Sequence, residues 1–217
     1  MDFAGTFQSE FVTFMLKGFL LTLEVAGISI LLSFAVGILI AILRYTKIPV
    51  LSQALFLWVE CIRNLPLLLI IVFMYFGLDP FNISLTPKVA VIWALVIFES
   101  AMISEIVRSG LNSIDKGQTE AARSSGLTYV QTMRYILLPQ ALRRMIPPTV
   151  SQFISLLKDT SLATVIALPE LMHSTSIVYA QHVSYVFPAI LFAAFLYWAV
   201  NYPLSLVARR LEKRFTT

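Results

Sequence analysis

Apolar residues are gathered into five long segments that are separated by shorter polar stretches. The apolar segments cover residues 18–43, 51–78, 89–107, 147–166 and 186–208. A helix needs about 20 apolar residues to cross the hydrocarbon core of a bilayer, and each segment is near or above that length. We therefore expect an all-α, polytopic membrane protein with five transmembrane helices, forming a single domain over residues 1–217.

Prolines in two of these segments bear on their shape. Pro66 follows Glu60 and Arg63 in the middle of the second segment. Because proline has no N–H and cannot continue a regular helical ladder, we expect this span to be kinked or divided into two helices. The fourth segment opens with Pro147 and Pro148, a pattern that favours a helix beginning there.

The composition agrees with a membrane protein and excludes several other classes. Hydrophobic residues make up 58% of the chain, and charged residues only 13%. The net charge of +4 does not indicate nucleic-acid binding, because the lysines and arginines lie beside the apolar segments. Cys61 is the only cysteine, so no intrachain disulfide can form and no cysteine–histidine cluster suggests a metal site. The stretch before Lys17 contains Asp2 and Glu10 and lacks the features of a removable signal peptide.

The placement of lysine and arginine predicts the orientation of the spans. With five spans, Lys17 and Lys88 fall on one side of the membrane and the other cations outside the spans fall on the opposite side. Those other cations are Arg44, Lys47, Arg108, Lys116, Arg123, Arg134, Arg143, Arg144, Arg209, Arg210, Lys213 and Arg214. Since cytoplasmic loops carry the excess of positive charge, we expect an outside N-terminus, an inside C-terminus and a cytoplasmic loop over residues 108–146.

Local signals predict the shape of this loop. Asp115 is placed to cap a short helix over residues 119–125, and Gly126 to end that helix in a left-handed conformation. The stretch Thr128-x-x-Gln131 is typical of a capping box, which would open a second helix that stops near Pro139.

The loop also carries a long motif, in which Glu120-Ala121-Ala122 is followed by Gly126 and then by Ile136-x-Leu138-Pro139. It resembles the E-A-A-x3-G-x9-I-x-L-P signature of permease subunits of binding-protein-dependent ABC importers, with every position matched. The resemblance covers nearly the whole chain and is nearest to the polar amino acid uptake branch. Further matching segments are Gly18-x-x-x-Thr22-Leu23, Arg63-Asn64-x-Pro66-Leu67-Leu68, Phe98-Glu99-x-Ala101-x-x-x-Glu105-x-x-Arg108-x-Gly110 and Lys158-x-Thr160-Ser161-Leu162.

The resemblance implies a multi-pass, non-enzymatic subunit of the bacterial inner membrane that works by alternating access. It implies a cytoplasmic dimer of ABC ATPase subunits, an extracytoplasmic solute-binding protein, and a second permease copy or homologue. No GxxxxGK[ST] stretch is present, so ATP and magnesium are expected on the ATPase, with no cofactor and no catalytic residue in this chain. The resemblance further implies a coupling helix that docks on the ATPase through Glu120, Ala121, Ala122 and Gly126. The alternative for this helix is an ordinary amphipathic helix at the membrane surface.

Charged residues lie near the middle of two spans. At about 1.5 Å per residue, Glu99 is about 16 Å along its helix from Lys88, and Lys158 is about 15 Å from Pro148. A charge at this depth costs about 2.5 kcal/mol or more unless it faces water, protein or a counter-charge. We therefore expect a polar cavity in which Glu99 or Asp159 meets the ammonium group of an amino acid and Lys158 meets its carboxylate. Further candidates for substrate contact are Met102, Gln152, Ser155, Thr160 and Ser161.

The same charges could instead serve only structure. Glu99 could pair with Lys158, or Asp159 with Arg63, and so tie helices together. Structural pairing is also expected for Glu60 with Arg63, for Glu105 with Arg108, and for Glu24 with a partner that the sequence does not identify. His173 and His182 are expected in a solvated outer connection.

Two other classes of function compete with the importer subunit. An ion-coupled secondary amino acid carrier could use Glu99 and Asp159 as an ion relay, but it leaves the loop motif without a role. A membrane enzyme has no HExxH or GxSxG motif to support it. Acidic residues outnumber basic residues within the spans, which tilts the predicted substrate mildly toward cationic amino acids such as arginine or histidine and leaves glutamine open.

Overall fold

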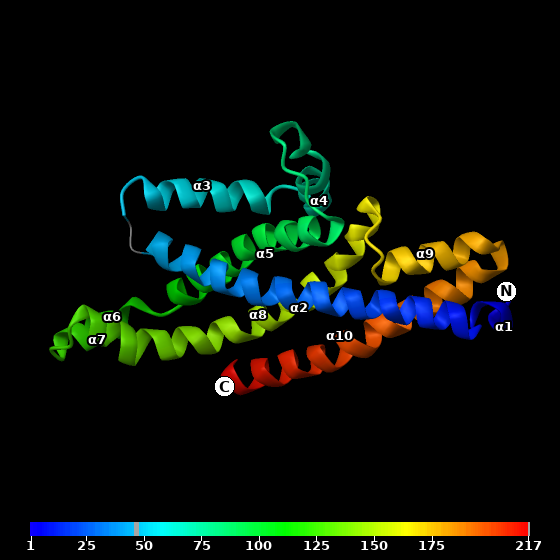
Figure 1. Cartoon of the computed structure of the whole chain (residues 1–217). Helices are drawn as coiled ribbons and strands as arrows, with labels where there is room; N and C mark the ends of the chain where they lie inside the picture. The colour runs from blue at the N-terminus through cyan, green and yellow to red at the C-terminus, as the bar shows by residue number, and fades with distance from the viewer. Residues whose placement is uncertain (46–47, 217) are drawn as a thin grey trace.

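The computed structural model describes residues 1–45 and 48–216, and these residues form helices and turns without a strand (Figure 1). The long helices are α2 (Ser9–Tyr45), α5 (Pro87–Asn112), α8 (Leu138–Asp159) and α10 (Val186–Thr216). The shorter helices are α1 (Phe3–Thr6), α3 (Leu51–Arg63), α4 (Leu67–Phe76), α6 (Lys116–Ser124), α7 (Tyr129–Thr132) and α9 (Leu171–Gln181). Tighter or wider helical turns occur at η1 (Asp79–Phe81), η2 (Met133–Leu137), η3 (Thr160–Ile166) and η4 (Val183–Tyr185). Lys47, one of the cations behind the predicted orientation, lies outside the described residues.

The helices agree with the predicted membrane architecture. Within the described part of the chain, α2, α5 and α10 are each long and apolar enough to cross a membrane alone. Two broken pairs add further spans, namely α3 with α4 and the α7–η3 run with α9. The all-α membrane fold is therefore confirmed, and five spans result if each broken pair crosses once. The predicted orientation stays a prediction.

The predicted break at Pro66 occurs, and it is sharp. Helix α3 ends at Arg63, and Pro66 takes an extended conformation before α4 begins at Leu67. The two helix axes are bent by 102°. The missing N–H of proline and the restriction on the residue before it explain why the ladder stops here.

The predicted helix start at Pro147 is wrong. Pro147 and Pro148 lie inside α8, which begins at Leu138. The second helix of the loop likewise does not stop near Pro139, because the helical run continues through η2 into α8 and past Pro139. The wide turn η2 joins α7 to α8, with the N–H of Leu138 bonded to the carbonyl of Met133.

The predicted outer connection after residue 166 also differs from the structure, because it contains helix α9. His173 lies half-buried in this helix, so its expected place in a solvated loop is wrong, whereas His182 is exposed as predicted. Helix α9 is bent by 52° from the preceding helical run. If this pair crosses the membrane once, α8 and α9 are its two halves, and the predicted orientation makes α8 the inner half and α9 the outer half.

The core of the molecule is the contact of α2 with α5. Figure 1 shows α2 running along the molecule, with α6 and α7 at one end and the N-terminus and α9 at the other. Small residues on α2 permit the close approach, and a Cβ added to Gly37 would lie 2.7 Å from the Cβ of Ile103 on α5. Around this contact, buried side chains of α2, α4, α5, α8 and η3 form one apolar cluster.

Candidate functional site

Glu99 is the most deeply buried of the predicted substrate residues. Its side chain lies on α5 at 0% exposure. The Nε2 of Gln152, on α8, donates a hydrogen bond to its Oε2 at 2.9 Å, whereas its Oε1 has no hydrogen-bond partner among the described residues. Among the described residues, Glu99 forms no ion pair with Lys158, and Asp159 forms none with Arg63. The two structural pairs considered from the sequence are therefore absent.

An open cleft of about 730 Å³ lies next to this buried pair, between α5, α8 and α10. Of the predicted substrate residues, it is lined by Gln152, Ser155 and Lys158, and α10 adds polar and charged side chains to the same cleft. Those side chains of α10 are Ser205, Arg209 and Glu212. Gln152 therefore connects the cleft to Glu99 behind it.

The other predicted substrate residues do not line this cleft. Met102 is half-buried on α5, and Asp159 is half-buried at the end of α8. Thr160 is buried, and its hydroxyl donates to the carbonyl of Leu157 at 2.7 Å. Together with the half-buried Ser161, Thr160 opens the turn η3 at the break of the fourth span.

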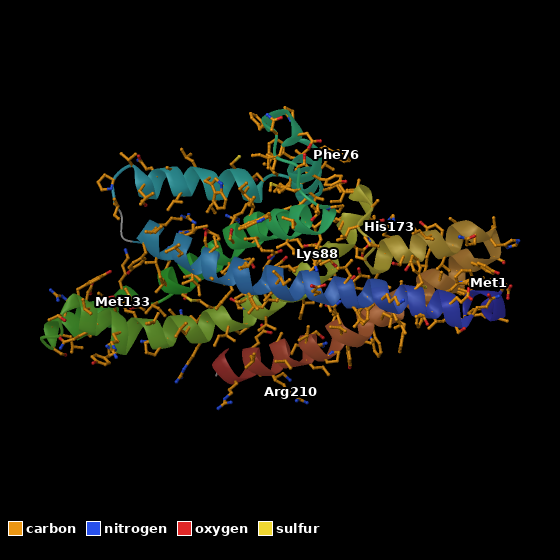
Figure 2. The ribbon with its side chains drawn as sticks, viewed as in Figure 1. Met1, Phe76, Lys88, Met133, His173 and Arg210 are labelled. Atoms are coloured by element: carbon orange, nitrogen blue, oxygen red, sulfur yellow. The ribbon has the colours of Figure 1, made fainter. Side chains whose placement is uncertain are left out.

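The remaining acidic residues of the spans have basic partners, as predicted for Glu24, Glu60 and Glu105. Glu24 on α2 pairs with Lys88 at 2.5 Å, and Figure 2 labels Lys88 close to α2. Glu60 pairs with Arg63 at 3.0 Å. Glu105 pairs with Arg108 and also with the buried Arg44, at 3.2 Å, in a contact that the sequence did not reveal.

The short helix α6 has the predicted caps. The Oδ1 of Asp115 accepts a hydrogen bond from the N–H of Gly117 at 2.7 Å, which starts α6 at Lys116. Gly126 follows the helix with a φ of 84°, a conformation that suits glycine. The capping box of Thr128 with Gln131 is formed and opens α7. Figure 2 shows Met133, which follows α7, at the end of the molecule opposite Met1.

The small residues of α6 do not form one exposed face. Ala122 is only 7% exposed and faces the rest of the chain. Glu120, Ala121 and Gly126 are exposed, and a Cβ added to Gly126 would meet nothing within 4 Å. Of the four residues predicted to dock on an ATPase, three are therefore exposed and Ala122 is buried, and their docking stays a prediction.

Glu170 is a buried polar residue that the sequence prediction missed. It stands at the N-cap of α9 with 0% exposure, and its side chain accepts hydrogen bonds from the N–H groups of Met172 and His173. The signal available in the sequence was an acidic residue after Pro169 and directly before an apolar helical stretch. Acidic residues are favoured at helix N-termini, so the position could have been recognised as a cap.

Comparison with known families shows which protein family the chain belongs to. Residues 16–217 match the family described as "Binding-protein-dependent transport system inner membrane component". The chain belongs to this family. The permease is 62% identical, over 100% of both chains, to a Bacillus subtilis (strain 168) protein described as a probable glutamine ABC transporter permease protein, GlnP. It is 41% identical, over 92% of both chains, to a second such protein of the same organism, GlnM.

A solved structure resembles the permease over almost its whole length. It is described as the crystal structure of an amino acid ABC transporter with histidines, and it matches at a TM-score of 0.91 and 28% identity, covering 99% of each chain. The MetNI methionine ABC transporter matches at a TM-score of 0.73 and 20% identity, covering 94% of this chain and 99% of the other, and shows the shared fold alone.

These comparisons confirm the predicted family and the multi-pass inner-membrane location. A permease of this class works with an ATPase and a binding protein, which confirms the predicted partners in outline. The related proteins are transport components rather than enzymes, and the ion-coupled carrier gains no support.

Proposed function

We propose that this permease carries glutamine across the membrane as part of an ATP-driven amino acid importer. The observation that carries the proposal is the 62% identity, over 100% of both chains, to a protein described as a glutamine permease. The ion pairs of the spans remove the main reason for favouring cationic amino acids. The predicted tilt toward cationic amino acids depended on an excess of acids, but Glu24, Glu60 and Glu105 have basic partners.

The path that we propose for the substrate runs through the cleft between α5, α8 and α10. Gln152 holds the buried Glu99 by a 2.9 Å hydrogen bond, and the second oxygen of Glu99 is unpaired among the described residues. That oxygen would accept from the ammonium group of the substrate once Gln152 moves, and the exposed Lys158 would meet the carboxylate. Asp159 and its neighbours Thr160 and Ser161 would contact the amino acid deeper along the same path, with Met102 and Ser155 completing its walls.

Coupling to ATP is assigned to α6. We propose that Glu120, Ala121 and Gly126 dock on an ATPase that binds ATP and magnesium, while Ala122 supports the helix from inside. Two permease protomers, either two copies or this chain with a homologue, would enclose the path, and a solute-binding protein would deliver the amino acid from outside. Residues 108–146 thus form the coupling loop of a single permease domain.

Reconstitution tests this proposal. Proteoliposomes with the permease, its ATPase and its binding protein should accumulate radiolabelled glutamine when ATP is enclosed, and unlabelled glutamine should compete better than arginine, histidine or glutamate. A matched preparation without ATP controls for leakage. Accumulation of arginine or histidine in preference to glutamine would contradict the assigned substrate, and accumulation driven by an ion gradient without ATP would contradict the transporter class.

A further inference from the structure

A buried hydrogen-bond network surrounds Glu170, and its residues do not line the cleft between α5, α8 and α10. Its centre is Glu170, whose Oε2 accepts from the hydroxyl of Thr22 on α2 at 3.5 Å and from the hydroxyl of Tyr197 on α10 at 3.3 Å. The same carboxyl group accepts from the N–H of Met172 at 2.9 Å and from that of His173 at 2.7 Å. One side chain thus joins the start of α9 to two membrane helices.

Helix α2 reinforces this junction. The hydroxyl of Thr22 accepts from the N–H of Leu171 at 3.1 Å while it donates to Glu170, so Thr22 serves as both acceptor and donor. A Cβ added to Gly18, one helical turn earlier, would lie 2.9 Å from the backbone oxygen of Glu170. The backbones of α2 and α9 therefore meet at close range, and the contact has no room for a side chain.

The two halves of the fourth span have different neighbours. The inner half, α8, packs on α5 and α10, whereas the outer half, α9, packs on α2 and α10. Between them lies η3, after which Ala167 takes a left-handed conformation with a φ of 56°. A non-glycine residue in that conformation is strained and persists only when the surrounding contacts fix it. The network around Glu170 begins three residues after Ala167 and supplies such contacts.

We propose that Glu170 is a positioning residue for transport, which clamps α9 to α2 and α10 so that movement of α8 is taken up at η3. Helix α8 continues from the coupling loop through η2, so a shift of that loop moves the inner half of the span. Because α9 is clamped, the change of angle falls on η3. Asp159, Thr160 and Ser161 stand at that turn, so the same movement opens or closes the candidate substrate contacts. This inference rests on the proposed function and adds a residue to it.

Single-atom variants of the two hydroxyl partners test the clamp in the reconstituted complex. Tyr197→Phe removes one donor to Glu170, whereas Thr22→Val removes both a donor to Glu170 and the acceptor of the Leu171 N–H, and each keeps the shape of the side chain. The loss of one hydrogen bond in Tyr197→Phe predicts a fall of about fivefold in glutamine molecules carried per ATP hydrolysed, and Thr22→Val should lower the number further, with ATP hydrolysis retained in both. Thr22→Ser, which keeps the hydroxyl, should restore the wild-type ratio.

Thr175→Val is the matched control, because Thr175 is buried on α9 and, among the described residues, its hydroxyl bonds within that helix, to the carbonyl of Leu171 at 2.7 Å. This variant should lower the melting temperature without changing the number of molecules carried per ATP. A purely structural role of the network would make Thr22→Val and Tyr197→Phe behave in the same way as this control. Normal transport per ATP in both variants would therefore overturn the proposal.

Hydrogen exchange separates failure of the clamp from failure of the proposed function. In the wild-type complex, ATP should increase amide exchange over residues 160–168 and leave residues 171–181 protected, whichever amino acid is carried. Thr22→Val should remove the protection of residues 171–181. If ATP increased the exchange of residues 160–168 and residues 171–181 equally in the wild type, the clamp would be refuted. If instead the two segments differed as expected but the complex took up no glutamine with ATP, only the assigned substrate would be refuted.

Discussion

Replacing Glu99 with glutamine removes the negative charge from the proposed path and almost preserves the shape of the side chain. Gln152 can still donate to the amide oxygen at position 99, so the helices α5 and α8 should stay together. What changes is the unpaired Oε1, which is buried and has no other partner among the described residues. A substrate ammonium group that meets this oxygen would lose its partner of opposite charge.

The size of the effect follows from the burial of Glu99, which has 0% exposure. A hydrogen bond to a charged group contributes about 1.5–3 kcal/mol, which corresponds to a fall of roughly 10- to 150-fold in the efficiency of uptake. The same substitution at Glu24 is a matched control, because its ion pair with Lys88 is largely exposed. An exposed pair contributes about 0.2–1 kcal/mol, so Glu24→Gln should change uptake by less than about fivefold.

The assay is the initial rate of glutamine uptake into proteoliposomes at several glutamine concentrations, normalised to assembled transporter. Glu99→Gln should lower the rate at limiting glutamine, while the amount of bound ATPase stays the same. A variant with wild-type rates at every concentration would show that Glu99 does not contact the substrate. Loss of assembly would instead assign the residue to the packing of α5 on α8.

Three further predictions follow from the site and the coupling loop. Gln152→Leu leaves Glu99 without its donor and should lower stability by about 1–3 kcal/mol, measured as a fall in the melting temperature of the purified permease. Ala121→Trp should abolish capture of the ATPase in a pull-down assay without altering the melting temperature, because Ala121 is exposed. By contrast, Ala122→Leu should destabilise the loop by about 1–3 kcal/mol, because Ala122 is buried and a larger side chain would overpack the site. Gly126→Ala should cost about 1–2 kcal/mol because of the left-handed backbone, seen as faster proteolysis of the loop, and an unchanged cleavage rate would contradict this.

Features with local causes could be predicted from the sequence. The caps of the coupling loop depend on residues two or three positions apart, as in the bond from Gly117 to Asp115 and the capping box of Thr128 with Gln131. The break at Pro66 depends on a single missing N–H. Such features were therefore placed correctly before any tertiary contact was known.

Features that depend on distant contacts were missed. Helix α9 is short, and besides its local cap at Glu170 its first N–H, that of Leu171, bonds to the hydroxyl of Thr22, 149 residues away. Isolated helices of this length are marginal in water, so packing and capping decide whether α9 forms. The prolines at 147 and 148 misled the prediction for the same reason, because a preference for the first turn is outweighed once packing on α5 and α10 holds the surrounding helix.

The candidate site was predicted by residue type but not by pairing. The depth of Glu99 along its helix could be counted from the sequence, but the sequence did not show that its side chain would be buried within the chain. The sequence did not show which side chain would bond to Glu99. The observed partner, Gln152, is 53 residues away, and the alternative partner, Lys158, lies on the same helix α8. The side of α8 that faces α5 decides between the two, and that side is set by the packing of the whole bundle.

The central claim is that force from a separate ATPase reaches these membrane helices through α6. The most direct measurement compares glutamine uptake into proteoliposomes that contain the permease and binding protein with and without the ATPase, at equal amounts of permease and with ATP enclosed. Uptake should require the ATPase and should disappear with Ala121→Trp. Full-rate uptake by the permease without the ATPase would contradict the account.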